Sequence, residues 1–205
     1  MAKDSRIPSV LLFGIPCAGK GTVGKAIAKE LPRHFFYLSS GDMVRETSKL
    51  QSRIADELND YLRRGELVPD SIMVPMYKEG VICRKIYGNI SSDHTLLVDG
   101  MCRTAEQAEE LADLLDFKEV LHLDNVPKAE VLERCKKRGE GRIDDTPEAM
   151  SRRIKEYWDV TWPALDYFHR NHISIHPLNA LLPKDMVVKN AVDYMKARYR
   201  ITSEW

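Results

Sequence analysis

A glycine-rich segment near the amino terminus carries the clearest chemistry in this sequence. Residues 14–22 read Gly-Ile-Pro-Cys-Ala-Gly-Lys-Gly-Thr and follow a short apolar run. Glycines allow backbone N–H groups to converge on one anion, and a helix that starts there adds its positive dipole end. Lys20 is placed to reach the outer phosphates of a nucleotide. The segment predicts a phosphate-binding loop rather than a tight turn with an unrelated lysine.

Four arginines in the second half of the chain suit the same chemistry. Arg134 and Arg138 are one helical turn apart and share a helix face, and Arg142 and Arg153 follow. Phosphoryl transfer spreads negative charge over the moving group, so catalysis depends mostly on positioning and on fixed cations. We expect these arginines to converge on phosphates, although a solvated charged face is the ordinary alternative for such a run.

Two further segments combine an acidic residue with an arginine. Ser40 to Arg45 reads Ser-Gly-Asp-Met-Val-Arg, and Asp99 to Arg103 reads Asp-Gly-Met-Cys-Arg, with Gln107 four residues later. The planar guanidinium of arginine can bind two phosphate oxygens, and an aspartate at a strand end beside a phosphate loop can hold magnesium. Helix capping is the alternative role, by Ser40 or Asp42 in the first segment and by Thr104 with Gln107 in the second.

These residues are positioned by strands that alternate with helices. Strands are expected at Ser9–Phe13, Phe35–Leu38, His94–Asp99, Val120–Leu123 and His172–His176. Helices are expected at about 23–31, 50–63, 70–87, 104–113, 127–137, 146–169 and 184–199. The alternation predicts a parallel sheet covered on both faces. Trp158, Trp162 and Leu165 form a stripe that should pack on this sheet.

In their order along the chain, these segments resemble those of adenylate kinases, which belong to the nucleoside monophosphate kinase family. The resemblance is to the short-lid type of adenylate kinase. Gly65-Glu66-Leu67-Val68-Pro69-Asp70 resembles a further family segment that borders the AMP base. The resemblance covers about residues 9–199 and implies one α/β domain over residues 1–205. The implied fold is the P-loop NTPase type, a five-stranded parallel sheet with flanking helices. A helical monophosphate-binding insertion at about 40–75 and a short lid at about 138–145 complete it.

The resemblance also implies the reaction, Mg-ATP + AMP ⇌ 2 ADP, and a role for each residue. The implied catalytic residues are Lys20, Arg103, Arg138, Arg142 and Arg153. ATP would contact Gly14, Cys17, Ala18, Gly19, Lys20, Gly21, Thr22, Arg134 and Arg138. AMP would contact Ser40, Arg45, Val68, Gly100, Arg103, Gln107, Arg142 and Arg153. Thr22 and Asp99 would hold Mg²⁺, directly or through water.

The chain departs from the family pattern at two places. Cys17 stands where a glycine is usual, and a thiol beside a helix amino terminus should have a lowered pKa and react with alkylating agents unless nucleotide protects it. Met101-Cys102 replaces an aromatic-Pro pair associated with a cis peptide bond. A cis bond before Cys102 would cost about 3–4 kcal/mol, so we expect a trans bond or stored strain there.

Composition limits the remaining classes of function. The 31 Lys and Arg residues balance 31 Asp and Glu residues, which argues against non-specific nucleic-acid binding. No apolar run is long enough to span a membrane, and no targeting segment is evident. The cysteines at 17, 83, 102 and 135 are widely spaced, which predicts free thiols, a reducing compartment and a cytoplasmic location. The family resemblance favours a monomer.

Two other functions stay open on the sequence alone. One is a kinase for UMP, CMP or another monophosphate, because the single side chain of Gln107 cannot settle the choice of base. The other is a nucleotide-binding regulatory protein of low activity. Cys17, Cys102 and the three residues between Arg138 and Arg142 keep that reading open, whereas the retained lysine and arginines argue against it.

Overall fold

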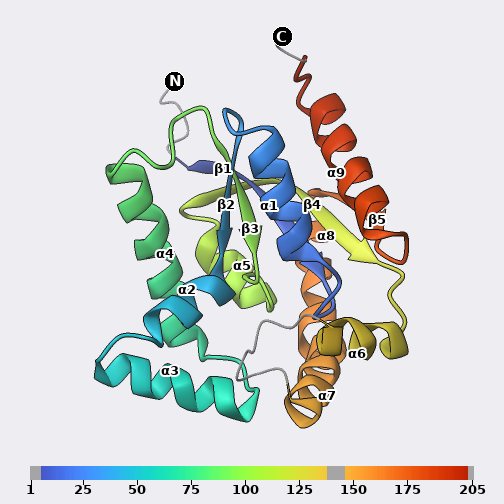
Figure 1. Ribbon diagram of the computed structural model, residues 1–205. Coiled ribbons are helices and arrows are strands. Elements are labelled where there is room, and N and C mark those ends of the chain that lie inside the picture. Colours follow the sequence, from blue (N-terminus) through green and yellow to red (C-terminus); the bar gives the residue numbers. More distant parts are fainter. Residues whose placement is uncertain (1–5, 138–145, 203–205) are drawn as a thin grey trace.

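The structure is a computed structural model that describes residues 6–137 and 146–202. A parallel sheet of five strands in the order β2-β3-β1-β4-β5 lies at its centre (Figure 1). The strands are β1 (Ile7–Gly14), β2 (Phe35–Ser39), β3 (Thr95–Asp99), β4 (Leu115–Asp124) and β5 (Ser174–Asn179). The predicted fold class is therefore confirmed.

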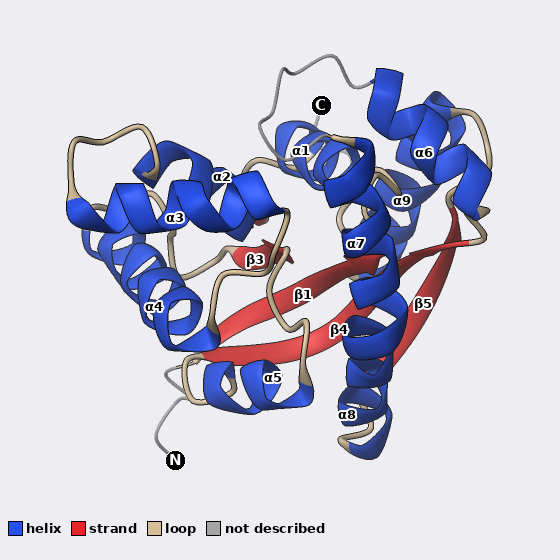
Figure 2. Ribbon diagram, turned by 90° about the horizontal axis from the view of Figure 1, so that it is seen from below, coloured by secondary structure: helices blue, strands red, loops and turns tan. Residues whose placement is uncertain are grey.

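Helices cover both faces of this sheet, α1 and α9 on one face and α5 and α8 on the other (Figure 2). The α-helices are α1 (Lys20–Glu30), α2 (Ser40–Thr47), α3 (Arg53–Arg64), α4 (Asp70–Ile86), α5 (Ala105–Leu111), α6 (Lys128–Lys137), α7 (Pro147–Glu156), α8 (Leu165–Arg170) and α9 (Lys184–Arg198). Among the residues described, no helix combines the length and apolarity that crossing a membrane would require.

The central strand β1 is buried because helices pack on both of its faces. Val10, Leu11 and Leu12 are fully or almost fully inaccessible to solvent. Strand β4 begins at Leu115, five residues before the expected start. The first half of this strand alternates buried and more exposed positions, and for that reason the sequence did not reveal it. Such alternation does not read as the continuous apolar run that marks a buried parallel strand.

The carboxyl ends of the parallel strands meet at one edge of the sheet. The glycine-rich loop, α2 and the segment after Asp99 each follow a strand at this edge. Ser39, the last residue of β2, pairs with Asp99, the last residue of β3, and Leu12 of β1 pairs with Asp99 from the other side. At this edge α2 and α3 stand on one side and α6 and α7 on the other (Figure 1). The topology therefore brings segments that are distant in sequence to one place.

The long helix expected at 146–169 is interrupted. α7 ends at Glu156, and a π-helix (Tyr157–Thr161) and a 3₁₀ turn (Trp162–Ala164) precede α8. Pro163 has no N–H to donate and its ring crowds the preceding turn, which removes an α-helical hydrogen bond at this point.

In the stripe predicted to pack on the sheet, Leu165 is buried and Trp162 packs against the hydrophobic core. For Trp158 the prediction is wrong, because 49% of its surface is exposed.

A substitution in α1 tests how closely this helix packs on the sheet. A Cβ added at Gly24 would lie 2.4 Å from Cδ2 of Tyr37 and 2.6 Å from Cδ1 of Leu12. We expect Gly24→Ala to lower the free energy of unfolding by about 1–3 kcal/mol in urea denaturation, despite the better helix propensity of alanine. Lys29→Ala, on the exposed side of the same helix, should stay within about 0.5 kcal/mol of the parent. A Gly24→Ala protein as stable as the parent would contradict this packing.

Candidate active site

The predicted phosphate loop joins β1 to α1. At its start Gly14 has φ 146°, and a Cβ there would lie 2.5 Å from the carbonyl oxygen of Leu123, so only glycine fits. At its end Gly19 caps α1 with φ 104°, and no side chain of the described residues caps that helix. The first N–H groups of α1 therefore point at the loop without a side-chain acceptor, which is the arrangement that binds an anion.

The ammonium group of Lys20 is held by the backbone of the loop itself. Its Nζ donates to the carbonyl oxygens of Gly14 at 2.5 Å and Ile15 at 3.1 Å. These two bonds curl the side chain over the loop and place its charge at the anion site.

A cavity of about 910 Å³ opens over the loop. It contains most of the predicted site residues: Gly14, Cys17, Ala18, Gly19, Lys20, Gly21, Thr22, Arg45, Asp99, Gly100, Arg103, Arg134 and Arg153. Its volume is in the range of sites that enclose a small-molecule ligand.

A smaller pocket of about 70 Å³ adjoins this cavity. The predicted acceptor residues that line it are Ser40, Arg45, Val68, Gly100, Arg103, Gln107 and Arg153. Arg45, Arg103 and Arg153 line both spaces. The structure therefore brings together the predicted donor and acceptor residues, and the arginines stand between them.

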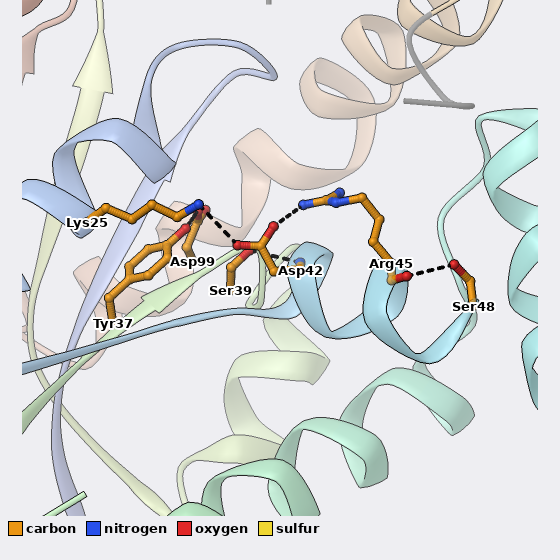
Figure 3. A network of polar contacts seen from close by, with 7 residues as sticks. All are labelled: Lys25, Tyr37, Ser39, Asp42, Arg45, Ser48 and Asp99. Carbon is orange, nitrogen blue, oxygen red and sulfur yellow. Dashed lines mark hydrogen bonds and ion pairs between the residues drawn. The ribbon is translucent and has the colours of Figure 1, made fainter. Parts of the chain in front are cut away.

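Arg45 is tied into a polar network that runs along α2 (Figure 3). Its Nη2 donates to Oδ1 of Asp42 at 2.5 Å, and Nζ of Lys25 lies 3.6 Å from Oδ2 of the same carboxylate. The cap of α2 is Ser39, whose hydroxyl accepts from the N–H of Asp42, rather than Ser40 or Asp42 as the capping alternative held. Ser40 instead has a buried Oγ with no hydrogen-bond partner among the described residues.

Gln107 is buried and both ends of its amide are engaged. Its Oε1 accepts from the backbone N–H of Arg103 at 2.9 Å, and its Nε2 donates to Oδ1 of Asp70 at 2.5 Å. Thr104 caps α5 by accepting from the N–H of Gln107, but the Gln107 side chain accepts from Arg103 rather than from Thr104, so only half of the expected capping box forms. Gln107 also lines the acceptor pocket. A carboxylate only accepts and an N–H only donates, which determines which way the amide faces.

The Met101-Cys102 departure is accommodated without a cis bond. The described residues contain no cis peptide, and Cys102 instead has φ 56°, in the left-handed region. Of the two expected alternatives, the trans bond is confirmed, and the strain lies in the positive φ of a non-glycine residue rather than in a cis peptide. Arg103 still lines the cavity, with its Nε donating to the carbonyl oxygen of Gly100 at 2.9 Å. Burial raises the pKa of the Cys102 thiol, so this thiol stays protonated.

The arginines expected around the lid are only partly described. Arg134 lines the larger cavity, with Nε donating to Oε1 of Glu130 at 2.8 Å, and Arg153 lines both spaces. Arg138 and Arg142 lie outside the described residues, as does the whole expected lid at 138–145.

The residues expected to hold magnesium line the cavity beside the phosphate loop. Thr22 lies in the first turn of α1, and Asp99 ends β3 with 8% of its surface exposed. Tyr37 donates from its hydroxyl to Oδ2 of Asp99 at 2.7 Å (Figure 3). A carboxylate and a hydroxyl are oxygen donors of the kind that Mg²⁺ prefers, so the residues fit the metal.

The prediction that all four cysteines are free thiols is wrong. Cys17 of the phosphate loop forms a disulfide with Cys135 of α6, 118 residues later, and only Cys83 and Cys102 are free among the described cysteines. The reactive Cys17 thiol is therefore absent in this state. Spacing carried no signal for this pair, because pairing depends on tertiary proximity. Cys17 also has φ 61°, the conformation that suits the glycine usual at this position.

Sequence reasoning missed Tyr37 and Glu156, and it named Asp42 and Asp70 without assigning either one a partner in the site. A signal existed for Asp42, which precedes Arg45 by three residues on one helix and so faces it. The others reach the site across the fold. Glu156 lines the cavity with Arg103 and Arg153, and desolvation of its carboxyl raises its pKa although both arginines act in the opposite direction.

Comparison with known proteins identifies the family. The family model described as adenylate kinase matches residues 12–173. The chain is 33% identical to an adenylate kinase of Cyanothece sp., covering 91% of this chain and 96% of the relative. It is 31% identical to that of Porphyromonas gingivalis, over 80% and 84%, and 30% identical to adenylate kinase isoenzyme 1 of Cyprinus carpio, over 95% and 97%.

The chain belongs to the adenylate kinase family. It is a nucleoside monophosphate kinase, and its reaction is reversible phosphoryl transfer between ATP and AMP. The family resemblance seen in the sequence is thus confirmed. The comparisons do not favour a UMP/CMP kinase or a nucleotide-binding regulatory protein of low activity.

The disulfide makes stability depend on redox conditions. Because the bond closes a loop between residues 118 apart, its reduction should lower the free energy of unfolding by about 2–4 kcal/mol. Urea denaturation with and without a dithiol reductant measures this difference, and Cys135→Ser should show none. Peptide mapping without reductant should recover Cys17 joined to Cys135. Equal unfolding midpoints in both conditions would contradict the bond.

Glu156 gives the stability a dependence on pH whose sign follows from its environment. Its folded-state pKa is raised, so its ionisation disfavours the folded state. This loss of folding stability is absent at pH values below the pKa of the carboxyl in the unfolded chain. It grows as pH rises from there through the higher pKa of the folded state. We expect Glu156→Gln to be more stable than the parent at pH 7, and the two proteins to converge near pH 4, about the ordinary pKa of glutamate. Denaturation between these two pH values tests this. A less stable variant at pH 7 would mean that attraction to the arginines outweighs desolvation.

Proposed function

We propose that the larger cavity binds Mg-ATP, that the smaller pocket takes the base and ribose of AMP, and that phosphoryl transfer occurs where the two spaces meet. The observation that supports this is the position of Arg45, Arg103 and Arg153, which line both spaces. A group that passes between two nucleotides needs cations that contact both phosphates, and these arginines stand at that boundary.

On the donor side, the amide groups of the phosphate loop and the start of α1 hold the ATP phosphates, and Lys20 reaches the transferred group. Arg134 contacts ATP from α6. It is paired with Glu130, so an incoming phosphate competes with that carboxylate. Thr22 and Asp99 would hold Mg²⁺, directly or through water, and the ion would supply positive charge to the ATP phosphates. The roles of Arg138 and Arg142 rest on the family resemblance alone.

On the acceptor side, Arg45 and Arg103 anchor the AMP phosphate, and Gln107 reads the base with an amide whose orientation is set by Asp70 and the N–H of Arg103. Ser40 and Val68 border the adenosine. At about 70 Å³ the smaller pocket is below the size of a nucleotide site, so we expect its walls to part when AMP enters. Transfer is direct, and no covalent intermediate on the enzyme is required.

ADP formation from Mg-ATP and a panel of acceptors tests these roles. AMP should be preferred over UMP, CMP, GMP and dAMP. Lys20→Ala should reduce kcat at least about 100-fold, because a cation aimed at developing charge is lost. Arg103→Ala should lower kcat and raise the KM for AMP with little effect on the KM for ATP.

The matched control is Lys189→Ala, which removes an exposed lysine of α9 that is paired with Asp193. This variant should keep the activity of the parent. Full turnover by Lys20→Ala, or faster turnover with another monophosphate than with AMP, would contradict the assigned roles.

A further inference from the structure

Tyr37 is buried in part under α1 and is bonded to Asp99 from the neighbouring strand. Its hydroxyl donates to Oδ2 of Asp99 at 2.7 Å, and the two side chains lie together at the carboxyl edge of the sheet (Figure 3). Both residues line the larger cavity. Strand β2 pairs with β3 from Phe35 to Ser39, so the backbone on which the tyrosine stands is held in register with that of the aspartate.

A gap in the side chains of α1 leaves room for the tyrosine ring. A Cβ at Gly24 would lie 2.4 Å from Cδ2 of Tyr37, and one at Gly21 would lie 3.3 Å from its Oη and 3.7 Å from Oδ2 of Asp99. The two glycines are three residues apart and so face the same way on the helix. This glycine slot, Gly21 with Gly24, gives the ring the space under α1 from which its hydroxyl reaches Asp99.

The side chain of Lys25, which also belongs to α1, lies near the same ring. Its Nζ is 6.0 Å from the centroid of the ring and is ion-paired with Asp42. The phenol therefore packs between α1 and the sheet, with an ammonium group nearby. Its hydroxyl is the donor that this packing directs to the Asp99 carboxylate.

We propose that Tyr37 is a positioning residue for the known reaction: its hydroxyl, placed by the glycine slot of α1, holds the Asp99 carboxylate in the orientation that the Mg²⁺ of Mg-ATP requires. The inference rests on the proposed role of Asp99. An aspartate side chain that is free to rotate presents its oxygens in several directions, whereas one with an oxygen fixed by a donor presents the other in a set direction. Tyr37 thus acts through Asp99 and contacts neither nucleotide base.

Tyr37→Phe tests the inference because it removes only the hydroxyl. Calorimetry would measure the affinity for ATP with Mg²⁺ and with a chelator, and the ratio of the two gives the gain due to the metal. We expect this gain to fall about tenfold, as for a lost hydrogen bond to a charged group, with the chelator value unchanged. The Mg²⁺ concentration for half-maximal activity should rise similarly, while the KM for AMP stays the same.

Tyr194→Phe is the matched control. It also removes a tyrosine hydroxyl that donates to a carboxylate at 2.7 Å, that of Glu119, but it lies outside the cavity. Its metal gain should equal that of the parent. If Tyr37→Phe weakens ATP binding equally with and without metal, or leaves the gain unchanged, the inference is overturned.

Asp99→Asn separates this inference from the role on which it rests. This variant should lose the metal gain, and adding Tyr37→Phe to it should change nothing further, because both act through one carboxylate. An unaltered gain in Asp99→Asn would refute the role of Asp99 itself. If Mg²⁺ no longer raises the ATP affinity of Asp99→Asn but still raises that of Tyr37→Phe as in the parent, only the role of Tyr37 is refuted.

Discussion

The amino end of α1 has to stay open to an anion, and much of the site follows from that constraint. A helix leaves its first N–H groups without partners, and most helices supply a side-chain acceptor for one of them. α1 is capped by Gly19, whose side chain can accept nothing. Gly14 lets the loop pass within contact of the Leu123 carbonyl, and Lys20 is held over the loop by two backbone carbonyls. Positive potential is thereby concentrated where phosphates are expected.

Charge compensation is the second organising feature of the site. Arg45 is paired with Asp42 and Arg134 with Glu130, each one turn away on the same helix. Such pairs hold the guanidinium groups near the cavity, so their conformational entropy is partly lost before a substrate arrives. With the proposed roles of Arg45 and Arg134, an incoming phosphate would replace a carboxylate that already pairs with each guanidinium. Glu156 differs from these acids, because desolvation outweighs the arginines that face it.

The two departures from the family pattern both lead to left-handed backbone at a cysteine. Cys17 has φ 61° and Cys102 has φ 56°. Conformations of this kind cost about 1–3 kcal/mol each and persist where the surroundings impose them. Cys17 is held by its disulfide to Cys135, and Cys102 is completely buried. The strain is thus located beside the residues proposed to contact phosphate.

The sequence by itself determined the phosphate loop, the alternation of strands and helices and the family, because these depend on local spacing and hydrophobic period. Those signals act over a few residues, so Gly19, Lys20 and Gly21 could be read directly. Only the tertiary structure decided which distant groups meet. Tyr37 reaches Asp99, Asp70 reaches Gln107, and Cys17 reaches Cys135 through strand pairing and helix packing. The exposure of Trp158 was decided in the same way, since a helical period does not reveal which face the core will cover.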